Sequence, residues 1–111
     1  MYKHKDVVWV SFPFSDGSDI KARPALVLSN SAINKTGDYL LVQITTKVKN
    51  DGLSIEIDES DFISGTLEVK SYLRIHKIFI LNESLILKKQ GAIRSAFLKK
   101  SLDKLLSVIS E

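Results

Sequence analysis

Alternating apolar and polar residues are the dominant pattern of this chain, and they predict strands along most of it. The clearest case is "LSIEID" (53–58), in which Leu53, Ile55 and Ile57 share one face and polar residues the other. Further strands rich in β-branched and aromatic residues are predicted at 7–14, 39–46 and 66–81, and a short one at 85–89. The polar, turn-rich stretches 15–22 and 59–65 are predicted to be loops.

The segment "PALVLSN" (24–30) is apolar on both alternations, which is typical of a central strand. A proline is tolerated at the first position of such a strand, and Pro24 is predicted to occupy it. Pro24 fixes its own φ and biases Arg23 toward an extended backbone. The Arg23 guanidinium is therefore expected at the entrance to a buried strand. It either serves a ligand there or closes the rim of the fold by bonding to nearby carbonyls.

Only the end of the chain has a clear helical period. At helical spacing, one apolar stripe is formed by Leu98, Leu102, Leu105, Leu106 and Ile109. Ser95 is the expected N-cap. About six strands followed by one amphipathic helix predict a mainly β protein: a small, strongly curved, barrel-like sheet covered by a helix. At 111 residues, we expect a single domain spanning 1–111.

Composition narrows the chemistry. The chain has no cysteine, so disulfides and cysteine nucleophiles are excluded. His4 and His76 lie 72 positions apart with no metal-binding spacing, so neither a metal nor another cofactor is expected. The start "MYKHKD" carries no apolar segment of a signal peptide, and no apolar run approaches the ~20 residues of a membrane span. We therefore expect a cytoplasmic protein without membrane association.

The formal net charge of +3 is distributed unevenly. Residues 1–49 carry +3, residues 50–69 carry −6 and residues 70–111 carry +6. This asymmetry favours one basic surface that meets a polyanion or an acidic partner. For Lys99, Lys100 and Lys104 the alternative is a solvated helix face.

Candidate chemistry falls on arginine and hydroxyl groups. Arginine is a poor proton carrier but binds phosphate oxygens in bidentate fashion. In "YLLVQITT" (39–46), alternation puts Thr45 on the more polar face with Gln43, whereas Thr46 continues the apolar face. Thr45 is therefore the preferred functional hydroxyl, and Thr46 the structural one.

Three segments in order, "DVVWVSFPFSDGSDIKARPALVLSNSAIN", "QITTKV" and "SYLRIHKIFILNESLI", resemble the MazF/PemK family of toxins from type II toxin–antitoxin systems. The resemblance implies an SH3-like barrel of the CcdB/MazF type with a C-terminal helix, usually homodimeric. It also implies an endoribonuclease that cleaves single-stranded RNA without a metal and is neutralised by an acidic antitoxin.

Transferred residue by residue, the resemblance makes Arg23 and Thr45 catalytic and gives Ser71 a substrate contact. Many family members have "QIR" where this chain has Lys77-Ile78-Phe79, and Arg74 and His76 are the candidates to replace the missing groups. A half-buried strand histidine without a substrate contact is an equally good interpretation of His76. The loops 15–22 and 47–52 are expected to recognise bases, with Asp16, Ser18, Lys21 and Lys47 as candidate contacts.

RNA chemistry then suggests a mechanism. The 2′-OH attacks its own phosphate and expels the 5′-oxygen, while Arg23 and Thr45 stabilise the charge on the phosphoryl oxygens. The expected product is a 2′,3′-cyclic phosphate. The general base and acid stay open among His76, the acids of loop 15–20 and Arg23.

Two other functions fit the same barrel. One is a non-catalytic RNA-binding barrel. The other is a gyrase poison like CcdB, which uses a Trp-Gly-Ile chain end; this chain ends in "LLSVISE" with its only tryptophan at Trp9, which disfavours that function.

Overall fold

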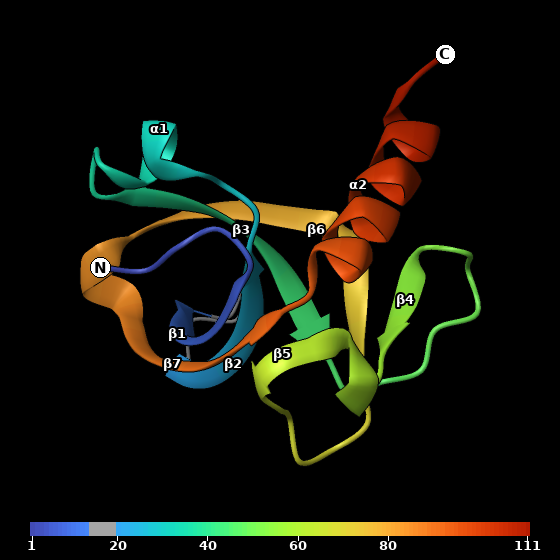
Figure 1. Ribbon diagram of the computed structural model, residues 1–111, viewed down its shortest axis with the longest axis horizontal. Coiled ribbons are helices and arrows are strands. Elements are labelled where there is room, and N and C mark those ends of the chain that lie inside the picture. Colours follow the sequence, from blue (N-terminus) through green and yellow to red (C-terminus); the bar gives the residue numbers. More distant parts are fainter. Residues whose placement is uncertain (14–19) are drawn as a thin grey trace.

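The structure is a computed structural model that describes residues 1–13 and 20–111. Seven antiparallel strands form one curled sheet in the order β4-β6-β3-β2-β1-β7-β5, with α2 beside it (Figure 1). The strands are β1 Asp6–Pro13, β2 Ile20–Val27, β3 Asp38–Thr45, β4 Ser54–Ile57, β5 Phe62–Gly65, β6 Ser71–Asn82 and β7 Ile86–Ile93. The helices are α1 Ser31–Asn34 and α2 Ser95–Ile109, with 3₁₀ turns η1 Glu59–Asp61 and η2 Glu83–Leu85. The predicted mainly β fold with a C-terminal helix is confirmed.

Apolar side chains on the two faces of the sheet build two cores. In β3, Val42 and Ile44 belong to the first core, whereas Tyr39 and Leu41 belong to the second. Helix α2 covers the first core with its N-terminal turns, where Phe97 is buried. The predicted alternation of β3 is thus the feature that separates the two cores. No helix in the described part of the chain is both long and apolar enough to cross a membrane.

The predicted start of the strand that contains Pro24 is wrong in a way that matters for function. Strand β2 starts at Ile20, so Pro24 lies inside the strand rather than at its first position. Residues 20–24 of β2 pair only with β1, for example Arg23 with Val10. Pairing of β2 with β3 starts one residue later, at Ala25 opposite Gln43. Proline is compatible here because it has no N–H to donate to a second neighbour.

Other corrections concern shorter pieces. The stretch 59–65 is not a loop: η1 and β5 occupy it, and β5 pairs with β7. Alternation could not reveal β5 because Phe62 is its only buried residue. The strand predicted from residue 66 begins only at Ser71, and β7 extends to Ile93. Ser95 is the first helical residue, so Arg94 takes the N-cap position instead.

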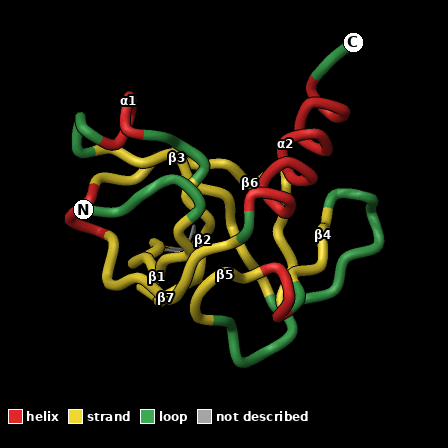
Figure 2. The backbone as a smooth tube through the Cα atoms, viewed as in Figure 1, coloured by secondary structure: helices red, strands yellow, loops and turns green. Residues whose placement is uncertain are grey.

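Strand β6 bends sharply at its centre, as the tube in Figure 2 shows. Val42 of β3 faces Ile78 and Ile44 faces Leu73, so residues 74–77 of β6 stand opposite Gln43 alone. Such a bulge leaves the extra residues unpaired with β3 and re-aims their side chains. The first part of β6 pairs also with β4, and the second part continues only beside β3.

Gly65 and Gly91 bring β5 close to β7. Gly65 has φ +65°, and an added Cβ would lie 2.2 Å from the carbonyl oxygen of Gln90. An added Cβ at Gly91 would lie 2.4 Å from the carbonyl oxygen of Ser64. Both positions therefore require the absence of a side chain.

We predict that Gly65→Ala lowers the melting temperature more than Gly52→Ala does. Gly52 also has a positive φ, +77°, but an added Cβ there meets nothing within 4 Å. Gly52→Ala should therefore cost only the left-handed backbone strain, about 1–2 kcal/mol, whereas Gly65→Ala adds a steric overlap. Thermal denaturation of both variants checks this, and equal melting temperatures would contradict the close approach of β5 to β7.

Candidate active site

The site starts where β2 and β3 separate. Ala25 pairs with Gln43, and antiparallel register would place Arg23 opposite Thr45 if the ladder continued by two residues. The ladder stops at Ala25, so the two strand ends diverge with Arg23 and Thr45 on the same face. A gap in a sheet at this point exposes side chains of both strands.

A cavity of about 340 Å³ occupies this gap. We call it the Arg23 cavity. It is lined by Trp9, Ala22, Arg23, Pro24, Ile44, Thr45, Thr46, Leu67, Glu68, Val69, Ser71, Lys88 and Gln90. Arg23, Thr45 and Ser71, the three residues that the family resemblance singles out, all line this cavity.

The hydroxyl of Thr45 is held in place by the chain that follows it. The backbone N–H of Lys47 donates to Thr45 Oγ1 at 3.2 Å. This bond occupies one lone pair and leaves the hydroxyl proton available for an incoming acceptor. Thr46, predicted to be structural on the apolar face, is exposed and lines the same cavity. The strand ends at Thr45, so alternation no longer applies to Thr46.

Ser71 is buried, and its hydroxyl donates to the carbonyl oxygen of Val69 at 2.7 Å. Its proton is therefore engaged in the turn that leads into β6. In this arrangement Ser71 shapes the cavity wall and offers an incoming group only its lone pairs.

Trp9 and its partners are the part of the cavity that sequence reasoning missed. Trp9 Nε1 donates to Gln90 Oε1 at 2.9 Å, and Gln90 Nε2 donates to the carbonyl oxygen of Thr66 at 2.7 Å. The indole is thus fixed as one wall. Lys88, which pairs with Trp9 across β1 and β7, also lines the cavity. The only signal in the sequence is a lone tryptophan in a predicted strand. That Trp9 lies in the same cavity as Arg23 could not be inferred from the sequence.

A second hollow, of about 350 Å³, meets the first at Thr45. We call it the lysine hollow. It is lined by Gln43, Thr45, Lys47, Lys49, Asp51, Arg74, His76 and Lys77. Thr45 is the residue that the two hollows have in common.

Arg74 is engaged within the protein rather than presented to a substrate. Its Nη1 and Nη2 donate to the two carboxylate oxygens of Asp51, both at 2.9 Å, and Nη1 also donates to Ser54 Oγ at 2.8 Å. Its side chain is only 8% exposed. The geometry does not favour the expected substrate contact, because a bidentate pair already occupies the guanidinium fork.

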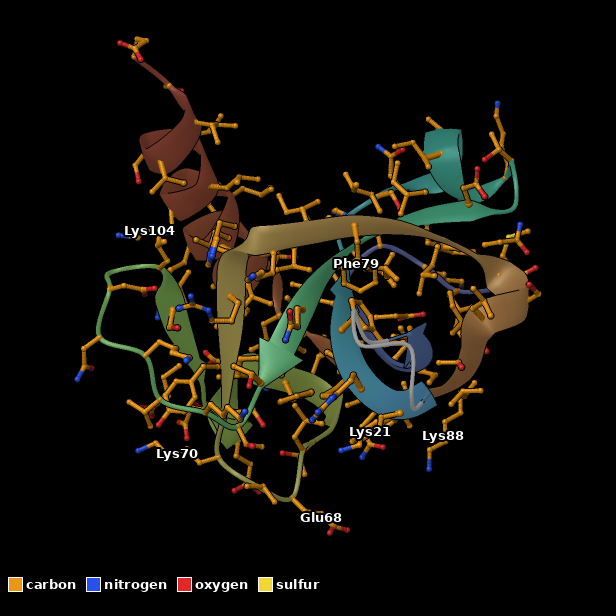
Figure 3. The ribbon with its side chains drawn as sticks, turned by 180° about the vertical axis from the view of Figure 1, so that it is seen from behind. Lys21, Glu68, Lys70, Phe79, Lys88 and Lys104 are labelled. Carbon is orange, nitrogen blue, oxygen red and sulfur yellow. The ribbon has the colours of Figure 1, made fainter. Side chains whose placement is uncertain are left out.

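His76 is exposed, not half-buried; it belongs to the bulged segment 74–77, which does not pair with β3. Lys47 is exposed and lines the lysine hollow with His76. Lys21 is exposed on β2 and lies at the edge of the molecule in the view of Figure 3. Asp16 and Ser18 lie outside the described residues.

The described residues contain no group of three or more histidine, cysteine or acidic side chains that could hold a metal ion.

A family profile of the PemK-like, MazF-like toxins of type II toxin–antitoxin systems matches residues 3–109. The chain belongs to this toxin family.

Solved structures of MazF-type proteins share the fold of this member. A mycobacterial endoribonuclease in complex with its cognate antitoxin has a TM-score of 0.79 and 20% identity, covering 98% of this chain and 95% of that chain. A MazE–MazF complex from Deinococcus radiodurans has a TM-score of 0.79 and 22% identity, and the match covers 97% of this chain and 95% of that chain. The Mycobacterium tuberculosis toxin MazF-mt6 has a TM-score of 0.71 and 15% identity, covering 93% of each. No curated protein sequence matches significantly.

The pair of Asp51 and Arg74 makes a pH-dependent contribution to stability. Hydrogen bonds from Arg74 hold the pKa of the Asp51 carboxyl well below its usual range. A carboxyl with a lowered pKa in the fold stabilises fully above its ordinary pKa of ~3.9. That stability is lost as the pH falls through the lowered value.

We therefore predict that Asp51→Asn lowers the melting temperature most near pH 7, and that its difference from wild type narrows as the pH falls below ~4. Asp103→Asn is the matched control, because it breaks the exposed pair of Lys99 and Asp103, which contributes little at any pH. Melting curves across pH decide the matter. A difference that stays constant with pH would show that the ionised pair is not its cause.

Proposed function

We propose that this toxin is a metal-independent endoribonuclease that cleaves single-stranded RNA. The observation that carries the proposal is the convergence of Arg23 and Thr45 on one cavity at the diverging ends of β2 and β3. Phosphoryl transfer needs positioning and charge stabilisation more than covalent help from the protein. A guanidinium and a hydroxyl with an available proton supply both.

In the proposed reaction the 2′-oxygen forms a bond to the adjacent phosphorus, and the bond from phosphorus to the 5′-oxygen breaks. Arg23 offsets the negative charge that develops on the non-bridging oxygens, and the Thr45 hydroxyl donates to one of them. The 2′-OH loses its proton to a base, and the 5′-oxygen gains one from an acid. Glu68 lines the Arg23 cavity with Thr45 and has no ion-pair partner among the described residues, so it is available for one of these proton transfers. The products are a 2′,3′-cyclic phosphate and a free 5′-OH.

Trp9 supports a single-stranded substrate. Unpaired bases can leave the stack and lie against an aromatic ring, which a duplex does not allow. The indole is a fixed wall of the Arg23 cavity, so a base can stack there without ordering the side chain first.

The proposed partner is an acidic antitoxin; the similar structure from Deinococcus radiodurans is a MazE–MazF complex. Basic residues around both hollows, among them Arg23, Lys47 and Lys88, favour an acidic segment that competes with RNA. A toxin acting on messenger RNA would work in the cytoplasm.

We predict that Arg23→Ala lowers kcat by roughly 10²–10³-fold while the melting temperature stays close to wild type. Wild-type cleavage should persist in EDTA and leave cyclic phosphate ends. Arg94→Ala is the control, because it removes an exposed arginine whose Nε donates to the Ser60 carbonyl and which lines neither hollow. Kinetics on a mixed-sequence RNA, with end mapping, make the measurement. Near wild-type cleavage by folded Arg23→Ala would refute its role, and RNA binding without any cleavage would favour the non-catalytic barrel.

We further propose that the toxin is a homodimer that buries the free end of α2. The predicted apolar stripe of α2 is buried at Leu98 and partly buried at Leu105, but it is exposed at Leu106 (56%) and Ile109 (67%). Figure 1 shows this half of the helix projecting from the sheet. Ile78 and Ile80 of β6 are exposed as well, and α2 packs beside β6. An apolar surface of this kind is typical of an interface.

Leu106→Glu is therefore predicted to shift the protein from dimer to monomer in sedimentation equilibrium. Leu87→Glu is the matched control: Leu87 is 55% exposed on β7, away from α2, and its substitution should leave the dimer intact. If both variants sediment as wild type does, α2 is not the interface.

A further inference from the structure

The lysine hollow has a positive charge that the catalytic proposal does not use. Lys47, Lys49 and Lys77 line it, and none of the three has an ion-pair partner among the described residues. The lining also contains the ion pair of Arg74 and Asp51, whose opposite charges cancel each other. The hollow therefore presents a net charge of +3 from side chains that are free to meet an anion.

Hydrogen bonds at both ends hold segment 46–53, which carries Lys47 and Lys49. Lys47 is tied to Thr45 through its own N–H, and Asp51 accepts the backbone N–H of Leu53 at 3.1 Å while holding Arg74. The carbonyl oxygen of Leu53 in turn accepts the N–H of Ile75 at 2.9 Å. The segment 46–53 thus cannot swing away without breaking a bidentate pair.

The bulge of β6 supplies the opposite wall. Because residues 74–77 face only Gln43, His76 and Lys77 are exposed at a place where a regular strand would pair. Whichever tautomer it adopts, the imidazole of His76 offers one N–H donor. The bulge thus places a donor and a cation in the same hollow as the lysines of segment 46–53.

We propose that the lysine hollow binds the RNA backbone phosphate next to the one that is cleaved. This subsite rests on the proposed ribonuclease function. Lys47, Lys49 and Lys77 neutralise the phosphate, and His76 donates a hydrogen bond to it. Arg74 does not touch it; Arg74 is a positioning residue that holds the segment with the two lysines.

Two observations favour a phosphate over a base or a peptide. The described residues lining the hollow include no Trp, Tyr or Phe, and their only ring is the small imidazole of His76, in contrast to the Arg23 cavity with the indole of Trp9. Thr45 lines both hollows, so a strand whose scissile phosphate lies at Thr45 continues directly into the lysines. A carboxylate-rich peptide has no such reason to be in register with Thr45.

The test uses an oligonucleotide with one mapped cleavage site and 2′-O-methyl nucleotides at all other positions. One linkage at a time is replaced by a neutral methylphosphonate. In wild type, we expect a single linkage beside the cleaved one at which the replacement raises KM roughly tenfold and leaves kcat nearly unchanged, because one phosphate contact is lost. In Lys77→Met and Lys49→Met, KM for the unmodified oligonucleotide should rise by a similar factor, and the same replacement should then have little further effect.

Lys35→Met is the matched control, since Lys35 is an exposed lysine after α1 and its loss changes the net charge equally. It should keep the full methylphosphonate effect. If Lys77→Met and Lys49→Met retain that effect, or if they weaken antitoxin binding and leave KM for RNA unchanged, the subsite is refuted. These outcomes are distinguishable from failure of the ribonuclease proposal, which would appear as no cleavage of the unmodified oligonucleotide by wild type.

Discussion

The separation of β2 from β3 at Pro24 is the constraint on which the site depends. If the ladder between the two strands continued, hydrogen bonds would join their ends and leave no gap between Arg23 and Thr45. Because Pro24 has no N–H, the ladder between β2 and β3 starts only at Ala25. The first five residues of β2 stay attached to β1 alone, and the space this leaves is the Arg23 cavity. The same residue that restrains the backbone of Arg23 therefore also makes room for a substrate.

A second irregularity, the bulge of β6, complements the first. It relieves residues 74–77 of pairing with β3 and allows Arg74 to turn toward Asp51 while His76 and Lys77 face solvent. Bulges of this kind often lie beside active sites because they re-aim side chains. The two departures from regular pairing lie on either side of β3, so its end at Thr45 becomes the meeting point of two differently charged hollows.

Alternation along the chain predicted the fold class, the two faces of β3 and the pairing of Thr45 with Gln43 on one face. It failed for β5, where Phe62 alone is buried, and for the start of β2, whose first residues pair only with β1. In the site, Arg23, Thr45 and Ser71 could be predicted because each belongs to a local motif or a strand end. Trp9, Gln90 and Lys88 could not, since they reach the cavity through the pairing of β1 with β7. The engagement of Arg74 by Asp51 depends on contact across 23 positions of sequence, which no periodicity encodes.

The position of Trp9 has a practical consequence. The chain contains one tryptophan, and its indole forms part of the wall of the Arg23 cavity with its N–H bonded to Gln90. Indole emission depends on the polarity and the stacking of its surroundings. The protein therefore has a built-in optical reporter, with no competing tryptophan signal, placed where occupancy of the cavity changes the light that it emits.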